Sequence, residues 1–193
     1  MKKILHRLAT LTLIGVSLFA GNALADNPKV KMKTTKGTMI IELYPDKAPI
    51  TVKNFLTYVN EGAYDGTIFH RVIKNFMNQG GGYTVTYKKK PTHDPIKNEA
   101  DNGLKNLKYT VAMARTSDPH SATNQFFINT NDNAFLDFTS KTPRGWGYAV
   151  FGKVIEGQDV VDRISEVRTG PRGPFPKDAP KVEIVIYKAT QIQ

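Results

Sequence analysis

Cysteine is absent from all 193 residues, and tryptophan occurs once. Without cysteine the chain has no disulfide, no thiolate nucleophile, no thiolate metal site and no lipidated N-terminal cysteine. Its stability must therefore come from a hydrophobic core. A chain of this length is long enough to bury a sizeable core as a single domain.

The residue patterns of common catalytic sites are also missing. None of the four histidines, His6, His70, His93 and His120, has the spacing of a zinc-binding helix motif. No nucleophile elbow or Walker loop occurs, and Gly80–Gly82 lacks the Lys-Ser/Thr that would make a phosphate cradle. Glu99 and Asp101 are close enough for a carboxylate pair, but their Asn- and Gly-rich surroundings are typical of a turn. We therefore expect neither a metal nor a cofactor.

Long apolar runs are scarce, and the longest one lies at the N-terminus. Basic residues at Met1–Lys3 and Arg7 precede an uncharged run from Leu8 to Phe19, and Ala23-Leu24-Ala25 follows it. This pattern predicts a signal peptide over residues 1–25, cleaved between Ala25 and Asp26, with a mature domain over 26–193. An N-terminal membrane anchor is the alternative, and the short run with its small-x-small ending disfavours it.

No later segment approaches spanning length, so we expect the processed protein to be soluble and free of the membrane. An exported protein without disulfides fits the cell envelope, and the periplasm is the expected location. Secretion from a single-membrane cell is the alternative.

Acidic residues are fewer than basic ones. The formal charge is +10, and without Lys2, Lys3 and Arg7 the domain keeps 24 basic against 17 acidic residues, a charge of +7. A basic domain can favour nucleic acid. The densest run, Lys88–Lys90, lacks the interleaved aromatics of a strand-binding groove, so we interpret it as a solvated loop and expect no nucleic-acid partner. A nucleic-acid binder would show a steep salt dependence.

The hydrophobic pattern predicts many short strands and two widely separated helices. The helices are expected over about 49–61, between Pro49 and Gly62, and over about 158–165. Strands are expected over 30–35, 38–44, 67–72, 109–114, 125–129, 148–154 and 182–187. Segments 83–106, 131–147 and 169–180 are expected to be loops, the last because it holds four of the eleven prolines. Seven or eight short strands without a βαβ rhythm favour one closed antiparallel barrel with a helix at each end.

One stretch, Phe69–Gly82, combines an arginine, a phenylalanine, a methionine and a glutamine: Arg71, Phe76, Met77 and Gln79. An arginine inside an apolar strand is costly unless its head reaches a surface or a partner. With no nucleophile nearby, these residues suit an apolar pocket with polar groups at its rim. Phe127 and Leu136 could join it at the outer face or mouth of a barrel, although core packing explains any one of them alone.

Five separated motifs resemble one known family. They are F-H-R-V-I-x-x-F-M-x-Q-G-G at 69–81, M-A-R at 113–115, S-A-T-N-Q-F-F-I-N at 121–129, N-A-F-L-D at 133–137 and Y-A-V-F-G-K-V at 148–154. Together they are similar to the cyclophilin family of peptidyl-prolyl cis/trans isomerases, and most of all to its periplasmic bacterial branch. The similarity covers residues 28–190 and implies a mainly β fold, a closed eight-stranded antiparallel β-barrel capped by two α-helices.

The resemblance also implies roles for individual residues. Arg71 matches the catalytic arginine, and Gln79 and Gln125 match polar positions that orient it and the substrate backbone. The walls of a proline pocket correspond to Phe76, Met77, Phe127 and Leu136. Ala114 and Arg115 match the segment whose main chain pairs with the residues before the proline. The implied substrates are proline-containing unfolded or flexible polypeptides, the implied protein is a monomer, and no cofactor is implied.

Several positions depart from the family pattern. Members that bind cyclosporin tightly have tryptophan where Phe135 stands, so weak cyclosporin binding is expected. Tyr148 replaces a common histidine at the edge of the pocket, Arg115 a frequent asparagine, and Lys74-Asn75 a Pro-Gly pair. We expect His70 to be a neutral, hydrogen-bonded structural residue. The predicted function is prolyl isomerisation that assists the folding of exported proteins; the alternative is a non-catalytic cyclophilin-fold chaperone or peptide-binding module.

Overall fold

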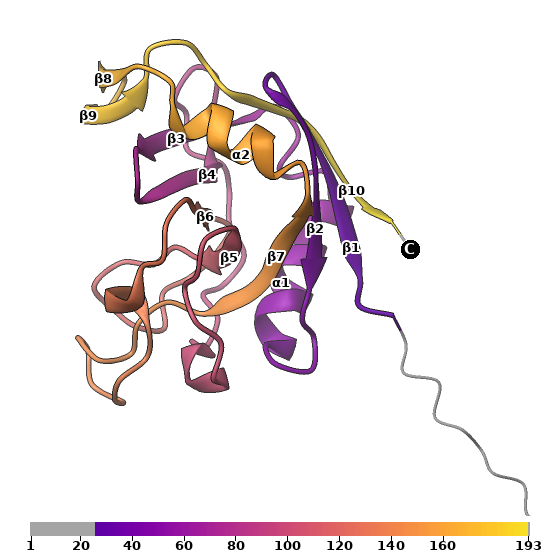
Figure 1. Ribbon diagram of the computed structural model, residues 1–193, viewed down its shortest axis with the longest axis vertical. Helices are drawn as coiled ribbons and strands as arrows, with labels where there is room; N and C mark the ends of the chain where they lie inside the picture. Colours follow the sequence, from indigo (N-terminus) through magenta and orange to yellow (C-terminus); the bar gives the residue numbers. More distant parts are fainter. Residues whose placement is uncertain (1–25, 193) are drawn as a thin grey trace, which may run out of the picture.

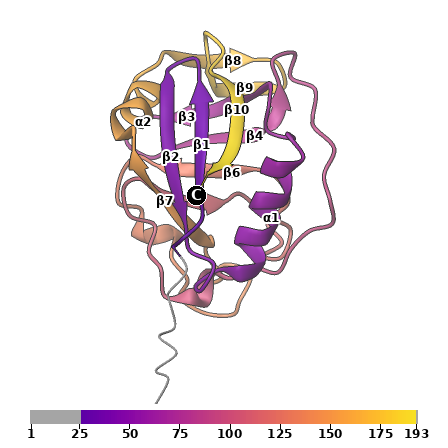
Figure 2. The ribbon, with the colours of Figure 1, turned by 90° about the vertical axis from the view of Figure 1, so that its right-hand side faces the viewer.

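The computed structural model describes residues 26–192, so the predicted signal peptide over 1–25 lies outside the described residues. Eight of its strands form a closed antiparallel barrel in the order β1-β10-β3-β4-β6-β5-β7-β2, and β8 and β9 form a separate two-stranded sheet (Figures 1 and 2). The expected eight-stranded barrel with two helices is therefore confirmed. The barrel strands are β1 Lys29–Thr34, β2 Gly37–Leu43, β3 Thr67–Ile73, β4 Met77–Thr84, β5 Thr110–Met113, β6 Phe126–Asn129, β7 Val150–Glu156 and β10 Val185–Ile192.

Alternation of apolar and polar side chains explains how the strands close around one core. In β1, Val30 and Met32 are buried while Lys31 and Lys33 are exposed, as expected for a strand with one face in water. The turn to β2 is made by Gly37, whose φ of +130° favours glycine. A β-carbon there would also lie 2.8 Å from Val160 Cγ2 in the second helix.

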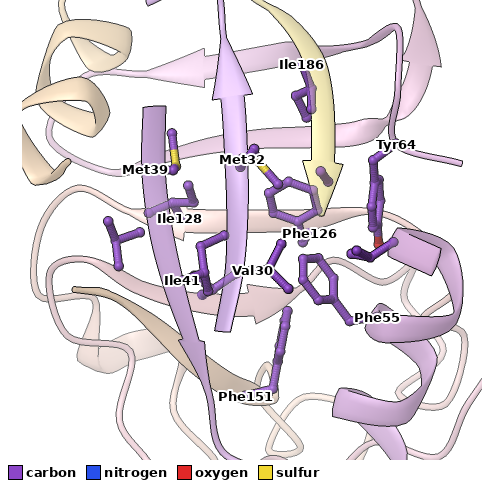
Figure 3. Close-up of a cluster of buried hydrophobic side chains, with 14 of the residues drawn as sticks. Val30, Met32, Met39, Ile41, Phe55, Tyr64, Phe126, Ile128, Phe151 and Ile186 are labelled. Atoms are coloured by element: carbon purple, nitrogen blue, oxygen red, sulfur yellow. The ribbon is translucent and has the colours of Figure 1, made fainter. Parts of the chain in front are cut away.

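The centre of the barrel is rich in aromatic rings (Figure 3). The ring of Phe55 lies 5.0 Å from that of Phe151 and 5.6 Å from that of Phe126, centroid to centroid. Tyr64 meets Phe126 edge-on at 5.4 Å, and its hydroxyl donates a hydrogen bond to the Asn124 carbonyl. These pairs add specific geometry to an otherwise aliphatic core.

The first helix, α1 Pro49–Asn60, begins at the proline that the sequence suggested and buries Val52, Phe55 and Val59 on the barrel. Its N-terminus is capped from a distant loop. Carboxylate oxygens of Glu99 accept hydrogen bonds from the backbone N–H of Ile50 and Thr51, at 3.1 and 2.8 Å, and from the Thr51 hydroxyl. A negative charge at this end of a helix is stabilising. Glu99 is thus a capping residue, and the carboxylate-pair alternative with Asp101 has no support here.

The second helix, α2 Gln158–Ser165, has the predicted bounds and buries Val160, Val161 and Ile164. Figure 2 shows α1 and α2 on opposite sides of the barrel. Two 3₁₀ turns, η1 Ala100–Asn102 and η2 Ala134–Leu136, interrupt segments expected to be loops. Within residues 26–192, the helices are too short or too polar for any of them to traverse a bilayer.

The segment over 169–180, expected to be a loop, is instead a hairpin of β8 Thr169–Arg172 and β9 Phe175–Pro180. Gly173, with φ +53°, provides the turn. Thr169 pairs with Pro180 and Arg172 with Phe175, and the register breaks between Gly170 and Arg172, where Pro171 lies. The prediction was wrong because proline is tolerated in a short edge hairpin at positions where no N–H is needed.

Two strands also differ from expectation. No strand was expected over 77–84, yet β4 lies there with Gly80–Gly82 inside it, and Gly81 adopts φ +86°. The closing strand begins at Val185, and Val182, which was placed in it, is largely exposed.

Candidate active site

Strand alternation builds a second apolar cluster on the outer face of the barrel. In β6, Phe126 and Ile128 point into the core while Phe127 belongs to the outer cluster. In β3, Phe69 and Val72 both join the core while Arg71 between them lines a surface cavity. Strict alternation would not do this, and the register of β3 against β4 shifts between Phe69 and Arg71. The outer cluster consists of buried Met77, Ala112, Phe127, Leu136 and Val150, with Phe76 and Tyr148 among the side chains packed against it.

A small cavity of about 110 Å³ opens in this cluster. It is far smaller than the several hundred Å³ typical of sites for drug-sized ligands, so it suits one small ring. Nine of the residues singled out from the sequence line it: Arg71, Phe76, Met77, Gln79, Ala114, Arg115, Phe127, Leu136 and Tyr148. Phe76, Met77, Phe127 and Leu136 give it apolar surface, and Arg71, Gln79 and Arg115 add polar groups. Segments far apart in the chain therefore meet at one site.

A short chain of polar side chains holds the arginine from one side. Arg71 and Gln79 are cross-strand partners in β3 and β4, and Arg71 Nη1 lies 3.4 Å from Gln79 Oε1. Gln79 Nε2 in turn donates to Gln125 Oε1 at 3.0 Å. Gly82 leaves room for Gln125, because a β-carbon at Gly82 would lie 2.5 Å from Gln125 Cγ. The two glutamines thus fix each other and limit the positions open to the guanidinium.

The opposite rim is formed by Arg115 and Tyr148. The Arg115 guanidinium lies 4.6 Å from the centre of the Tyr148 ring, and its Nε donates to the Gly147 carbonyl at 2.9 Å. Tyr148 meets Phe127 edge-on, with ring centres 5.6 Å apart. A cation over an aromatic face is attractive, so this pair forms a defined wall. The backbone N–H of Ala114 pairs with the Gln125 carbonyl at 2.9 Å, which continues the β5–β6 pairing to the rim.

Phe76 is held by groups that sequence reasoning did not single out. The preceding Asn75 has φ +57°, a left-handed conformation that asparagine tolerates. Asn75 can therefore take the turn position that glycine occupies in the Pro-Gly pair of the family pattern. Asn133 Nδ2 donates to the Phe76 carbonyl at 2.8 Å and to Asn129 Oδ1 at 2.7 Å. Asn129 continues the network to Asn106. The sequence signals were the asparagine that opens N-A-F-L-D and the one that ends S-A-T-N-Q-F-F-I-N.

Phe135 lies at the rim and does not line the cavity. Its side chain is 74 % exposed and stacks on Phe76, with ring centres 5.6 Å apart. It could contact a ligand that extends past the cavity, but not one confined within it.

His70 lies beneath the site and is only 2 % exposed. Its ring stacks on Phe175 of β9 and lies 4.7 Å from the Tyr83 ring. Burial, and secondarily the nearby Arg71 charge, lowers the pKa of His70 to about 4, so the ring is neutral at pH 7. The expectation was a neutral, hydrogen-bonded ring, and Nδ1 has no hydrogen-bond partner among residues 26–192.

A larger cavity of about 410 Å³ adjoins the first and shares Arg71, Gln79, Ala114 and Arg115 with it. Gln125 lines this larger cavity. Its charged lining residues are Arg71, Lys89 and Arg115, and no aspartate or glutamate lines it. One lysine of the run 88–90 therefore faces the site. A ligand that extends through both cavities would place a ring in the small one and its neighbouring residues in the larger, positively charged one, called here the basic basin.

Within residues 26–192, no three His, Cys, Asp or Glu side chains group in a way that could hold a metal ion. The small cavity presents no serine, threonine or cysteine as a nucleophile. It offers a slot for an apolar ring beside a positively charged hydrogen-bond donor. Such a site can stabilise charge or a lone pair on a bound ring without forming a covalent bond.

Comparison with known proteins agrees with this geometry. Residues 29–191 match the family model described as cyclophilin type peptidyl-prolyl cis-trans isomerase/CLD. The chain is 62 % identical to peptidyl-prolyl cis-trans isomerase cyp18 of Streptomyces antibioticus, over 83 % of this chain and 96 % of that one. It is 55 % identical to peptidyl-prolyl cis-trans isomerase B of Escherichia coli, over 83 % and 98 % of the two chains. It is 50 % identical to peptidyl-prolyl cis-trans isomerase A of Dickeya dadantii, over 96 % of each.

The fold is likewise similar to a solved structure. A cyclophilin type peptidyl-prolyl cis-trans isomerase of Cryptosporidium parvum, crystallised in the presence of the dipeptide Ala-Pro, matches with a TM-score of 0.67 and 26 % identity. The match covers 86 % of this chain and 99 % of that one.

Proposed function

The chain belongs to the cyclophilin-type family of peptidyl-prolyl cis-trans isomerases, and from this premise we propose which residues do the chemistry and where the enzyme works. The reaction is rotation about the peptide bond before proline. We place the proline ring in the 110 Å³ cavity and assign Arg71 as the catalytic residue. The observation that carries this assignment is the Arg71 guanidinium at the edge of a ring-sized slot. The other guanidinium that lines the slot, that of Arg115, is held against the Tyr148 ring and the Gly147 carbonyl.

The chemistry needs no nucleophile. Amide resonance sets a barrier of about 18–20 kcal/mol to rotation, and the uncatalysed exchange takes roughly tens to hundreds of seconds. As the bond twists, the prolyl nitrogen becomes pyramidal and its lone pair becomes available. An Arg71 N–H directed at that nitrogen binds the twisted state more strongly than either planar state. Such differential binding lowers the barrier, and each ~1.36 kcal/mol gives a tenfold increase in rate.

The apolar walls have a separate task. Met77, Phe127 and Leu136 are each at most 9 % exposed, so they form a fixed surface for the ring. With the ring held, the carbonyl side of the bond is the part that rotates. The walls also exclude water from the contact between the guanidinium and nitrogen, which strengthens that contact. Gln125 and the backbone at Ala114 and Arg115 lie where they can bind the residues that precede the proline.

The substrates we propose are unfolded or flexible segments that contain proline, because a folded loop rarely extends a ring into so narrow a slot. The site is complete within one chain, so it requires no second copy, and we propose a monomer. We also propose weak cyclosporin binding, since Phe135 is exposed at the rim and offers no hydrogen-bond donor where family members that bind the drug tightly have tryptophan.

We propose that the enzyme is located in the periplasm, where it would assist the folding of exported proteins. The support is the order of features at the start of the sequence: a basic segment, the uncharged run from Leu8 to Phe19, and Ala23-Leu24-Ala25. N-terminal sequencing of the protein from periplasmic extract should begin at Asp26. Protein recovered from the cytoplasm with residues 1–25 intact would contradict this proposal.

The catalytic assignment is tested by comparing Arg71→Ala with the unchanged protein. Transition-state binding predicts that Arg71→Ala lowers kcat by about two orders of magnitude, with peptide affinity within a few-fold. An Arg71→Ala variant that isomerises a peptide at the normal rate would refute the role of Arg71.

A further inference from the structure

The β8–β9 hairpin, which composition did not predict, reaches the edge of the site. Figure 1 shows β9 beside β3, the strand that carries Arg71. This placement brings Asp178 of β9 to the arginine, with Asp178 Oδ2 3.9 Å from Arg71 Nε. The Asp178 side chain is 23 % exposed and that of Arg71 is 39 % exposed, so both are partly shielded from water.

The backbone at Asp178 is unusual. Its φ is +63°, in the left-handed region that non-glycine residues seldom adopt, although aspartate is among those that tolerate it. Two residues of β9 touch neighbouring residues of β3: Phe175 stacks on His70 with ring centres 5.2 Å apart, and Asp178 faces Arg71. The hairpin also has its own anchor, because Arg172 pairs with Glu183. Its fold therefore does not depend on the contact between Asp178 and Arg71.

We propose that Asp178 is a positioning residue for the isomerisation, an inference that rests on the proposed catalytic role of Arg71. The guanidinium has three nitrogens. Its Nε faces Asp178, and its Nη1 lies against Gln79 at 3.4 Å. Its Nη2 makes no hydrogen bond to any residue of the described range 26–192. Two sides of the planar group thus face protein groups, through an ion-pair contact without a hydrogen bond at Nε and a hydrogen bond at Nη1. The third side is left to meet the prolyl nitrogen.

The Asp178 carboxylate acts mainly by fixing the orientation of the Arg71 guanidinium, and its effect on the charge of the site is secondary. A surface ion pair contributes little to stability, so loss of Asp178 should leave the fold intact. Freed from Asp178, however, the flexible arginine would sample orientations in which no N–H points at the ring. Misplacement of a catalytic group by about 1 Å can cost a hundredfold in rate, and a partial loss of orientation should cost about tenfold. If charge dominated, removal of the negative group would strengthen the guanidinium and raise the rate.

The test compares Asp178→Asn, Asp178→Ala and Asp178→Glu with the unchanged protein, each measured by cis/trans exchange of an Ala-Pro peptide. Asp159→Asn is the matched control, because Asp159 forms an ion pair with Arg163 on α2. We expect Asp178→Asn and Asp178→Ala to lower kcat by about tenfold with KM within twofold. Asp178→Glu should recover part of the loss, and Asp159→Asn should change neither constant.

Coupling to Arg71 separates positioning from a general structural effect. In an Arg71→Ala background, Asp178→Asn should cost nothing further, since no guanidinium is left to orient. The Nε–H resonance of Arg71 in a nitrogen-15 correlation spectrum should shift in Asp178→Asn and stay in place in Asp159→Asn.

The outcomes distinguish this inference from its premise. An unchanged or raised kcat in Asp178→Asn, with Arg71→Ala still impaired, would overturn the positioning role alone. Equal losses from Asp178→Asn with and without Arg71 would also overturn it. A fully active Arg71→Ala variant would overturn the catalytic role on which the inference rests.

Discussion

Acidification should destabilise the protein through one buried residue, His70. The unfolded chain exposes this imidazole, whose ordinary pKa is 6.5, whereas burial in the folded protein lowers the pKa to about 4. Below pH 6.5 the unfolded state therefore binds a proton that the folded state does not bind. Stability contributed by neutral His70 is fully present above pH 6.5 and is lost as the pH falls towards 4.

The size of the effect follows from the two pKa values. Their difference of about 2.5 units, at ~1.36 kcal/mol per unit, gives about 3 kcal/mol over the whole range. Between pH 7 and pH 4.5 the loss from this group should be about 2 kcal/mol. That is a large part of the total stability of a typical domain, which is about 5–15 kcal/mol.

Urea unfolding of the protein and of His70→Gln at pH 7 and pH 4.5 measures this loss. Glutamine has a similar reach and does not titrate, so His70→Gln should lose about 2 kcal/mol less on acidification than the unchanged protein. His93→Gln is the control, because His93 is half-exposed and paired with Glu61. Equal acid sensitivity in the unchanged protein and His70→Gln would refute the reasoning.

Three further changes test other parts of the structure. Glu99→Gln should lower the free energy of unfolding by about 1–2 kcal/mol, measured in urea, with kcat/KM unchanged, because it weakens the cap on α1. Gly82→Ala should push Gln125 from its place and lower kcat/KM several-fold with little change in melting temperature. If Gly82→Ala and Gln125→Ala lowered kcat/KM by clearly different factors, displacement of Gln125 would not be the cause. A peptide with glutamate two residues before proline should react faster than its lysine counterpart at low salt, because the basin is basic. Lys89→Gln should reduce this preference for the glutamate peptide. A preference as strong as that of the unchanged protein would exclude a role for Lys89.

Local sequence signals predicted those elements whose boundaries are set by local chemistry. Pro49 at the start of α1 and Gly157 before α2 mark helix starts that need no knowledge of the rest of the chain. Alternation in β1 and β2 likewise identifies strands, because one face meets the core and the other meets water. The number of strands and the lack of a βαβ rhythm then restricted the fold to a closed antiparallel barrel.

Most of the candidate site followed from the family motifs. Of the eleven site residues singled out from the sequence, all but Gln125 and Phe135 line the small cavity. Residues that act across long sequence distances did not follow. Glu99 caps a helix that begins 50 residues earlier, and Asn133 supports Phe76 across 57 positions. Neither contact leaves a periodic or spacing signal. Polar residues of this kind were interpreted from their neighbours in sequence, and those neighbours are typical of turns.

The hairpin over 169–180 shows a different limit. Its high proline and glycine content is typical of a loop, yet β8 and β9 pair in register, and a short edge hairpin tolerates prolines where no N–H is needed. Because that pairing was not predicted, the approach of Asp178 to Arg71 could not be predicted either. The contact became visible only with the arrangement of β9 beside β3.

The central claim is that the Arg71 guanidinium accelerates rotation about the X-Pro bond. It is tested most directly by NMR exchange between the cis and trans forms of a short Ala-Pro peptide, with the unchanged protein and with Arg71→Ala. The account predicts exchange far faster than the spontaneous rate, lost in Arg71→Ala while the peptide still binds. Equally fast exchange with both proteins would contradict it.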